Sequence, residues 1–433
     1  MKRNNYINVI GGGLAGSEAA YYLAEKGIKV KLFDIKPNNF TSAHSNKNYG
    51  ELVCSNSLKS NDVYGNACGL LKEELRLLGS MVIKVADSCK VPAGNALAVN
   101  REDFAQKITE NIKNHKNIEC FCEEITKIDL DIPTIIATGP LTKETLFDNI
   151  NEITGGSLYF YDAAAPIITY ESIDMDNAFI GDRFGQGTSD YINCPMDKDT
   201  YELLVNELIN SEKAVLHDFE KKEFFEGCMP IEIMAERGVE TLRFGPLKAK
   251  GLDDPKTGRW PYACLQLRKE NVEGNLYNLV GFQTNLKFGE QKRVFSIIKA
   301  LKNAEYVRYG VMHRNSYIDS PKVLNSDFSL KKYPLIFFAG QISGVEGYVE
   351  STASGLLAAI NMYRKLNGNE SLILDNTTVI GALSNYIATQ NDNFQPMNAN
   401  YGILAPLDIY IRDKKIKKLK MSERSLIQIR NII

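Results

Sequence analysis

The sequence predicts an α/β fold, in which a Rossmann-like nucleotide-binding domain is interrupted by a smaller α+β insertion domain. One observation behind this is a strand-helix-strand pattern with a glycine-rich turn over residues 6–34. A second is a pair of apolar segments, residues 133–140 and 335–341, that have the pattern of buried strands ending in small residues. Because the two segments lie far apart in the chain, we expect the first domain to be discontinuous.

The glycine-rich turn follows a predicted strand at residues 6–10 and begins a helical pattern that runs to Lys26. Its G-x-G-x-x-G spacing lets the backbone approach a pyrophosphate at the positive end of a helix. A second predicted strand, residues 29–33, is followed by Asp34, which can accept hydrogen bonds from ribose hydroxyls. We therefore favour dinucleotide binding over a merely tight turn. The turn residues expected at the nucleotide are Gly11, Gly12, Gly13, Leu14, Ala15 and Gly16.

The two later strands indicate which dinucleotide is bound. The first ends in Ala137, Thr138 and Gly139, and the second ends in Ala-Gly at Gly340. These ends resemble the return strands of FAD proteins with two dinucleotide-binding folds. Each strand alone could be an ordinary parallel strand that meets a glycine turn. Together they favour FAD over NAD.

The middle of the chain is irregular and rich in short apolar segments. Strands are predicted at residues 177–184, 242–244, 263–267 and 276–282, and helices at 198–211 and 231–236. The predicted domain boundaries are 1–170 and 305–433 for the FAD-binding domain and 171–304 for the insertion.

Composition excludes several classes of protein. The chain has 433 residues, 44% of them hydrophobic, and a net charge of −2, so no global field draws it to nucleic acid. We find no apolar run long enough for a membrane span and no signal peptide, and expect a cytoplasmic protein. The eight cysteines form no C-x-x-C pair and there are only four histidines, which argues against a structural metal.

Cys228 lies in the stretch FFEGCMPIEIMAERG, just before a predicted helix. Pro230 suits the first helical turn and Gly238 the C-terminal end. The partial positive charge at a helix N-terminus favours a thiolate, so Cys228 is a candidate nucleophile. The alternative is a buried structural cysteine.

Cys54, in GELVCSNSLKS, is the second candidate. Small polar residues follow it, which is typical of accessible backbone rather than of a core. The other six cysteines, among them Cys120 and Cys122 in an alternating strand pattern, are predicted to be packing residues.

Many blocks of the chain resemble the folate- and FAD-dependent tRNA (uracil-5-)-methyltransferases. A related flavoprotein group, the GidA-like tRNA wobble-modifying enzymes, shares the first glycine motif but not this set. The blocks are GGGLAGSEAAYYLAEKGIKVKLFD, GELVCSNSL, GLLKEELRLLGS, VPAGNALAVNRE, IIATGPLT, YFYDAAAPI, YINCPM, FFEGCMPIE, LVGFQTNLKFGEQKR, VRYGVMHRN, GVEGYVES and FQPMNANYG.

The resemblance implies an enzyme that moves a methylene group from methylenetetrahydrofolate to C5 of a uridine, usually U54 in the T-loop of tRNA. It implies that reduced FAD carries the methylene and that NADPH or NADH recharges the flavin. Its two functional cysteines match Cys54 and Cys228. It also places Glu346 and Tyr348 beside the flavin, and Phe219 could stack on folate or flavin, although a core aromatic is the simpler interpretation.

The chemistry explains why such an enzyme needs thiols. Uracil C5 is a poor nucleophile until a thiolate adds to C6, after which C5 can attack an electrophilic methylene. A base must then remove the C5 proton. We assign the C6 attack to Cys228, and to Cys54 either the role of base or the shielding of the flavin.

Binding of structured RNA would depend on clusters of cations rather than on net charge. Each cluster could equally be a solvated face. The tail, residues 412–424, has seven Lys/Arg against two acids, and phosphate contact there is the alternative to a solvated helix. The remaining candidates are Lys248, Lys250, Lys256, Arg259, Lys287, Lys292, Arg293, Arg308, His313 and Arg314.

The chain departs from the family pattern in places that bear on the substrate. Asn46 and Lys47 stand where the family commonly has a Thr-Asp pair, residues 248–252 read KAKGL instead of KPVGL, and Phe288 replaces a tryptophan. A ribosomal RNA uridine is therefore the first alternative substrate. Two rival functions are a flavin oxidoreductase of a small metabolite and a non-catalytic RNA-binding scaffold, and the oligomeric state is open.

Overall fold

A parallel sheet forms the centre of the larger lobe. In the computed structural model, which describes residues 6–41, 43–163, 165–185, 190–214, 229–271, 273–391 and 394–432, its strands pair in parallel throughout. Their spatial order is β16 (Ile336–Phe338), β7 (Thr134–Ile136), β1 (Tyr6–Ile10), β2 (Lys29–Asp34) and β6 (Ile118–Cys122). The four segments predicted as strands of the nucleotide-binding domain are thus neighbours, and the predicted α/β class is confirmed.

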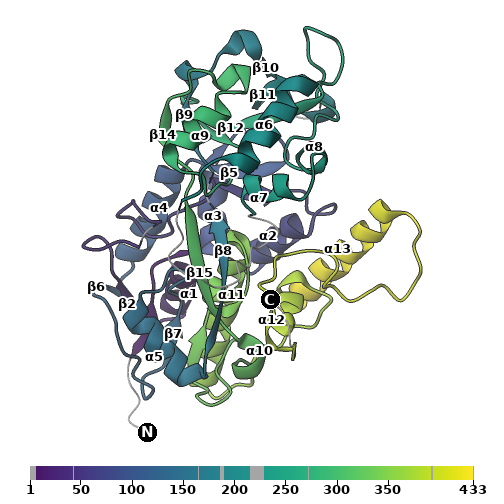
Figure 1. Cartoon of the computed structure of the whole chain (residues 1–433). Helices are drawn as coiled ribbons and strands as arrows, with labels where there is room; N and C mark the ends of the chain where they lie inside the picture. The colour runs from purple at the N-terminus through teal and green to yellow at the C-terminus, as the bar shows by residue number, and fades with distance from the viewer. Residues whose placement is uncertain are drawn as a thin grey trace.

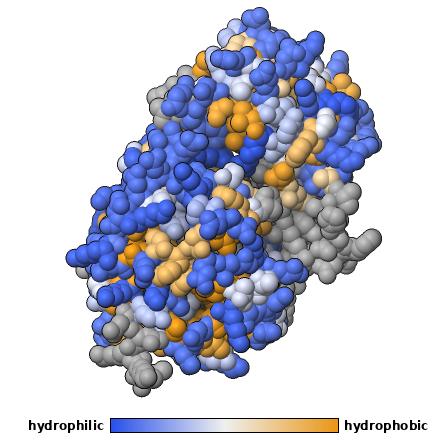
Figure 2. Space-filling view, turned by 90° about the vertical axis from the view of Figure 1, so that its left-hand side faces the viewer, coloured by the Kyte–Doolittle hydropathy of each residue, from blue (hydrophilic) through white to orange (hydrophobic). Residues whose placement is uncertain are grey.

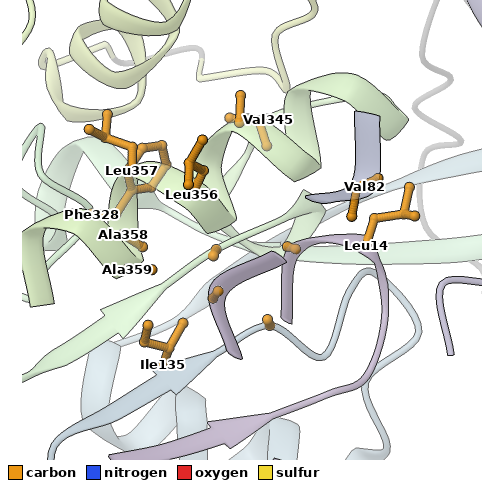
Figure 3. Packing of buried hydrophobic residues seen from close by; sticks show 14 of the residues in the cluster. Leu14, Val82, Ile135, Phe328, Val345, Leu356, Leu357, Ala358 and Ala359 are labelled. Atoms are coloured by element: carbon orange, nitrogen blue, oxygen red, sulfur yellow. The ribbon is translucent and has the colours of Figure 1, made fainter. Parts of the chain in front are cut away.

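Helices cover this sheet, and the closest packing is between the first helix and a late one. An added Cβ on Gly355 would lie 2.2 Å from the carbonyl oxygen of Ala15, so only glycine permits this approach. Figure 3 shows the buried apolar side chains around this contact. The helices of the lobe are α1 (Leu14–Glu25), α2 (Ala67–Leu77), α3 (Met81–Ser88), α4 (Arg101–Lys113), α5 (Glu144–Thr154), α10 (Ser320–Val323), α11 (Tyr348–Leu366), α12 (Val379–Ala388) and α13 (Lys414–Arg430).

A second sheet, antiparallel, forms the smaller lobe. Its order is β10 (Phe179–Ile180), β11 (Tyr191–Met196), β12 (Ala263–Lys269), β13 (Leu276–Leu279), β9 (Ile167–Thr169) and β14 (Tyr306–Arg308). The helices beside it are α6 (Lys198–Asn210), α7 (Ile231–Glu236), α8 (Thr241–Phe244) and α9 (Phe288–Phe295). We call this part the insertion lobe and the part with the parallel sheet the nucleotide lobe.

Each lobe has its own hydrophobic core. The core of the nucleotide lobe draws on residues 7–150 and 317–429, and that of the insertion lobe on residues 168–304. β9 and β14 lie just outside the predicted insertion of 171–304, yet they belong to its sheet. The domain boundaries stay a prediction, which these two cores support.

A two-stranded ribbon connects the lobes. β8 (Ser157–Ala163) leads toward the insertion lobe, and its antiparallel partner β15 (Met312–Ile318) returns from it. Figure 1 shows the ribbon running along the nucleotide lobe, with the insertion lobe at the top and α13 projecting at the right. A small sheet of β3 (Ser57–Ser60), β5 (Ala96–Val99) and β4 (Lys90–Val91) lies near the junction.

Three of the predicted short strands differ from the structure. Residues 242–244 belong to helix α8, because a three-residue apolar run carries no periodicity that separates strand from helix. Only β10 forms within 177–184, where the chain turns away at Phe184 with a φ of 57°. β13 ends at Leu279, before a turn at Gly281.

The surface is mainly hydrophilic on the face shown in Figure 2, with hydrophobic patches in both the upper and the lower part of the view. No helix within the described ranges is both long and apolar enough to cross a membrane.

Candidate functional site

A cavity of about 450 Å³ opens where the parallel strands end. Its walls include the turn after β1, the end of β2 and the loop after β7, as expected for ligand sites at the carboxyl edge of a parallel sheet. Arg268 and Gln283 add to the wall from the insertion lobe. The cavity therefore lies at the junction of the two lobes.

The glycine-rich turn forms the floor of the cavity at the N-terminus of α1. Gly11 has a φ of 103°, and a Cβ there would lie 2.4 Å from the carbonyl oxygen of Ala137. Gly13, the N-cap, has open space where a Cβ would be, and no side chain caps the helix. The free N–H groups and this open space fit the pyrophosphate of a dinucleotide.

Of the six turn residues that were predicted to contact the nucleotide, five line the cavity. The exception is Gly16, where a Cβ would lie 1.8 Å from the carbonyl oxygen of Gly11. Gly16 therefore serves the packing of the turn against its own helix. Those that line the cavity are Gly11, Gly12, Gly13, Leu14 and Ala15.

Asp34 lines the cavity at the end of β2, as its predicted role requires. Its Oδ2 accepts a hydrogen bond from the Gly12 N–H at 2.6 Å, and its Oδ1 accepts one from the Lys36 N–H at 2.8 Å. Each oxygen retains a second lone pair for a ribose hydroxyl. Asp34 thus also ties the glycine turn to the second strand.

The return-strand residues lie beside the glycine turn, because β7 pairs directly with β1. Ala137, Thr138, Gly139 and Gly340 all line the cavity. Gly139 and Gly340 have φ values of 73° and 79°, a left-handed region that favours glycine. The two segments that suggested FAD from sequence are thus brought to one site.

Cys54 lines the same cavity and is half-buried. Its Sγ lies 3.0 Å from the Tyr348 Oη, and its backbone N–H donates to that oxygen at 2.8 Å. The Ser55 N–H donates to the same oxygen at 3.3 Å. With both lone pairs of the hydroxyl occupied, its proton is directed to the sulfur. Burial, with the Cys54 sulfur, raises the pKa of Tyr348 well above its usual value, so the phenol keeps its proton.

Two arginines hold the backbone just before Cys54. Arg101 Nη1 donates to the carbonyl oxygens of Leu52 and Val53 at 3.0 and 3.2 Å. Arg308 Nη2 donates to the Val53 carbonyl as well. The sequence suggested Arg308 as an RNA contact, and that stays a prediction; in the structure this guanidinium donates to the backbone of the cysteine loop.

The residues after Cys54 are held from the insertion lobe. Arg268, on β12, donates from Nη2 to Ser55 Oγ at 2.6 Å and from Nε to Asn56 Oδ1 at 3.2 Å. The Asn56 Nδ2 in turn donates to the Lys269 carbonyl at 2.9 Å. The cysteine loop therefore contacts both lobes.

Glu346 also lines the cavity and is buried. Both carboxylate oxygens accept from Gln341 Nε2, at 2.8 and 2.9 Å. Sequence reasoning missed Arg101, Arg268 and Lys59, of which the last two line the cavity. Arg101 lies in one of the blocks that carry the family resemblance, and no sequence signal pointed to the other two.

Two predicted residues, Cys228 and Phe219, lie outside the described residues. Of the other cysteines predicted to be packing residues, Cys122 is exposed, which corrects that prediction. It is the last residue of β6, which is an edge strand, and burial along its face falls from Ile118 through Cys120 to Cys122.

The predicted RNA contacts of the insertion lobe divide into two groups. Lys287 and Arg293 are paired with carboxylates, Lys287 with Glu212 at 2.6 Å and Arg293 with Glu290 at 2.8 Å. Lys248 and Lys250 are exposed. Internal pairing reduces the charge that the first group offers to RNA.

Comparison with known proteins places the chain in a family. The profile of the Glucose inhibited division protein A family matches residues 6–370. The methylenetetrahydrofolate--tRNA-(uracil-5-)-methyltransferase TrmFO of Natranaerobius thermophilus is 58% identical, over 97% of each chain. The protein of that name from Fusobacterium nucleatum is 56% identical, over 99% of this chain and 98% of its own.

A solved structure of Aquifex aeolicus GidA has the same fold, with a TM-score of 0.71 over 99% of this chain and 73% of the other. Its 17% sequence identity carries no further argument. The identities to the TrmFO proteins, over nearly whole chains, are decisive: this chain belongs to the methylenetetrahydrofolate--tRNA-(uracil-5-)-methyltransferase TrmFO family, within the wider Glucose inhibited division protein A family.

Proposed function

We propose that this chain transfers a one-carbon unit from methylenetetrahydrofolate to C5 of uridine 54 in the T-loop of tRNA, with FAD as cofactor and NADPH or NADH as reductant. The observation that carries the proposal is the Cys54–Tyr348 pair in the cavity that the glycine turn also lines. The TrmFO relatives support the folate and tRNA parts of the proposal.

The residues that would hold FAD come from three parts of the nucleotide lobe. The turn from Gly11 to Ala15 would bind the pyrophosphate and Asp34 a ribose, and Glu346 and Tyr348 would lie beside the flavin. Ala137, Thr138, Gly139 and Gly340 would line the cofactor beside the glycine turn. Bound FAD would supply the redox chemistry that converts a methylene into a methyl group.

The thiols would act on the uracil ring. We assign to the Cys228 thiolate the addition to C6, which forms a C–S bond and makes C5 nucleophilic. Once C5 has bonded to the one-carbon unit, the Cys54 thiolate would take the C5 proton as the bond between that carbon and its carrier breaks, which leaves a methylene on C5. Addition of a hydride to this methylene, for which the bound cofactor would supply the electrons, would form the methyl group, expel the Cys228 thiolate from C6 and restore the C5–C6 double bond. In this scheme the Tyr348 hydroxyl stabilises the Cys54 thiolate until it accepts the proton.

The direct test is transfer of label from methylenetetrahydrofolate to RNA. The purified protein should be yellow and should label a tRNA transcript, but not the same transcript with cytidine at position 54. A ribosomal RNA transcript tested alongside distinguishes the alternative substrate, and NADPH and NADH are compared as reductants. Labelling of neither RNA, with FAD bound and reduced, would refute the proposed activity.

Single cysteine variants test the two roles. Cys228→Ala should abolish labelling and any covalent complex with RNA. Cys54→Ala should still form the complex with RNA but should not release methylated product, because the C5 proton has no acceptor. Full activity of either variant would refute the role assigned to it.

A further inference from the structure

The first half of α13 is an exposed helix with an unusual density of positive charge. Residues 412–420 contain six Lys/Arg and one Asp, in a chain whose net charge is −2. Nearly all of these side chains are exposed. The Asp413 side chain caps the helix by accepting from the Lys415 N–H at 2.7 Å, so the one acidic group is used internally.

The lysines at the start of α13 are available to a partner. No hydrogen bond or ion pair to the Nζ of Lys414, Lys415 or Lys417 occurs among the residues for which the structure gives positions. This contrasts with Lys287 and Arg293 of the insertion lobe, which carboxylates already pair. These three lysines therefore present positive charge to solvent that no described carboxylate neutralises.

Apolar side chains accompany the cations. Tyr410 is 91% exposed, Ile409 66% and Ile416 49%. An exposed aromatic ring beside lysines is the combination with which proteins stack unpaired bases and bind the adjacent phosphates.

The second half of α13 fixes the first half in place. Met421, Leu426 and Ile429 are buried in the core of the nucleotide lobe, and Ser425 Oγ donates to the buried carboxylate of Glu74 on α2. The exposed half is therefore a rigid arm and not a loose tail. Figure 1 shows its N-terminal end pointing upward, on the side of the insertion lobe where α8 lies.

A short path leads from the arm to the cavity. Asn398 lines the cavity, and three residues later the Tyr401 hydroxyl donates to the Tyr64 carbonyl at 3.2 Å. The Lys418 Nζ donates to the next carbonyl, that of Gly65, at 3.0 Å. An RNA that places one base in the cavity would extend beyond it, and residues 398–401 connect the cavity wall to the segment that α13 contacts.

We propose that the exposed half of α13, with the segment at residues 408–413, is an arm that binds the RNA backbone outside the cavity. This inference rests on the proposed function. RNA fits better than an anionic membrane, because phosphates need the separated lysines, whereas a membrane needs a continuous apolar face that this helix lacks. Tyr410 would stack on an unpaired base.

The test compares two triple variants of the full-length protein. K414Q/K415Q/K417Q should weaken binding of a tRNA transcript about tenfold near physiological salt and lower the slope of log Kd against log salt by about one per lysine. K26Q/K29Q/K116Q, at the opposite edge of the parallel sheet, removes the same charge from other exposed positions and should change neither. Tyr410→Ala should weaken binding without changing the slope.

Flavin content, flavin reduction without RNA and the thermal midpoint should be equal in both variants, so that a loss of RNA binding is not a loss of folding. If K414Q/K415Q/K417Q binds and methylates RNA like the parent, the arm is refuted while the proposed function stands. If it loses binding to phosphatidylglycerol vesicles but not to RNA, the partner is a membrane and the inference is wrong. If the parent methylates neither RNA, the proposed function fails, and the salt slope alone still decides whether the arm binds RNA.

Discussion

The Tyr348 hydroxyl lies 3.0 Å from the Cys54 sulfur, while its oxygen accepts the backbone N–H of the same cysteine. These two residues are 294 positions apart in the sequence. The arrangement fixes the direction of the phenolic proton, because the N–H groups occupy the lone pairs of the oxygen. The Tyr348 hydroxyl is thus positioned to donate a hydrogen bond to the thiolate form of Cys54.

Replacing Tyr348 with Phe should slow alkylation of Cys54 about tenfold at neutral pH, because a hydrogen bond to a charged group is lost. The measurement is iodoacetamide labelling of Cys54 followed by mass spectrometry. Tyr317→Phe removes a buried hydroxyl that instead donates to the Phe394 carbonyl, and it should leave the rate unchanged. An unchanged rate in the Tyr348 variant would show that the hydroxyl does not support the thiolate.

Arg268→Ala should lower the free energy of unfolding by about 1–3 kcal/mol, because Ser55 and Asn56 lose their charged donor in a buried place. Arg268→Lys should recover part of this, since an ammonium group can serve only one of the two oxygens well. Arg293→Ala, which breaks a half-exposed ion pair, should cost less than about 1 kcal/mol. Denaturant unfolding measures all three, and equal losses at positions 268 and 293 would contradict the buried role.

Substitution by alanine should affect stability at one glycine and FAD binding at another. Gly355→Ala forces a methyl group against the Ala15 carbonyl and should destabilise the fold by about 1–3 kcal/mol or more. Gly13→Ala meets open space, so the thermal midpoint should hardly change, but the added methyl group should reduce the FAD that copurifies. Absorbance at the flavin band and thermal unfolding distinguish the two. Unchanged flavin content in Gly13→Ala would argue against a pyrophosphate at this turn.

Glu74 should make stability depend on pH. Burial raises the pKa of this carboxyl to about 7, above the value of 4.5 expected in an unfolded chain. The folded state therefore holds a proton that the unfolded state has lost, so this contribution is fully present below pH 4.5 and disappears as pH rises through 7.

The matching experiment compares the parent with Glu74→Gln, which stays neutral. The stability difference, parent minus variant, should fall by up to about 3 kcal/mol between pH 4.5 and 8. Exposed Glu119→Gln serves as the control. A difference that grows with pH would mean that the N–H groups of Val379 and Ile380, which donate to this carboxylate, stabilise its charged form more than burial destabilises it.

The glycine turn and Asp34 could be predicted because their signal is local: a strand, a turn and a helix of fixed lengths determine where a phosphate can lie. Helix α7 was likewise predicted with its observed bounds, residues 231–236. Both rest on patterns that neighbours in the sequence define.

What the sequence could not supply are partners from distant parts of the chain. Arg268 joins Ser55 across 213 positions, and Arg308 turns to Val53 across 255. A lone arginine in a sequence has the same appearance whether it faces solvent or a buried carbonyl. The exposure of Cys122 was missed for a related reason, since strand order, and thus which strand is the edge, is a property of the whole sheet.

The anchoring of residues 52–56 has a consequence for movement. Arg101 belongs to the nucleotide lobe and Arg268 to the insertion lobe, and both donate hydrogen bonds to this short segment. Any rotation of the insertion lobe about the β8–β15 ribbon would therefore displace the residues around the Cys54 sulfur. The rate at which Cys54 is alkylated would then report how far the insertion lobe has closed toward the nucleotide lobe.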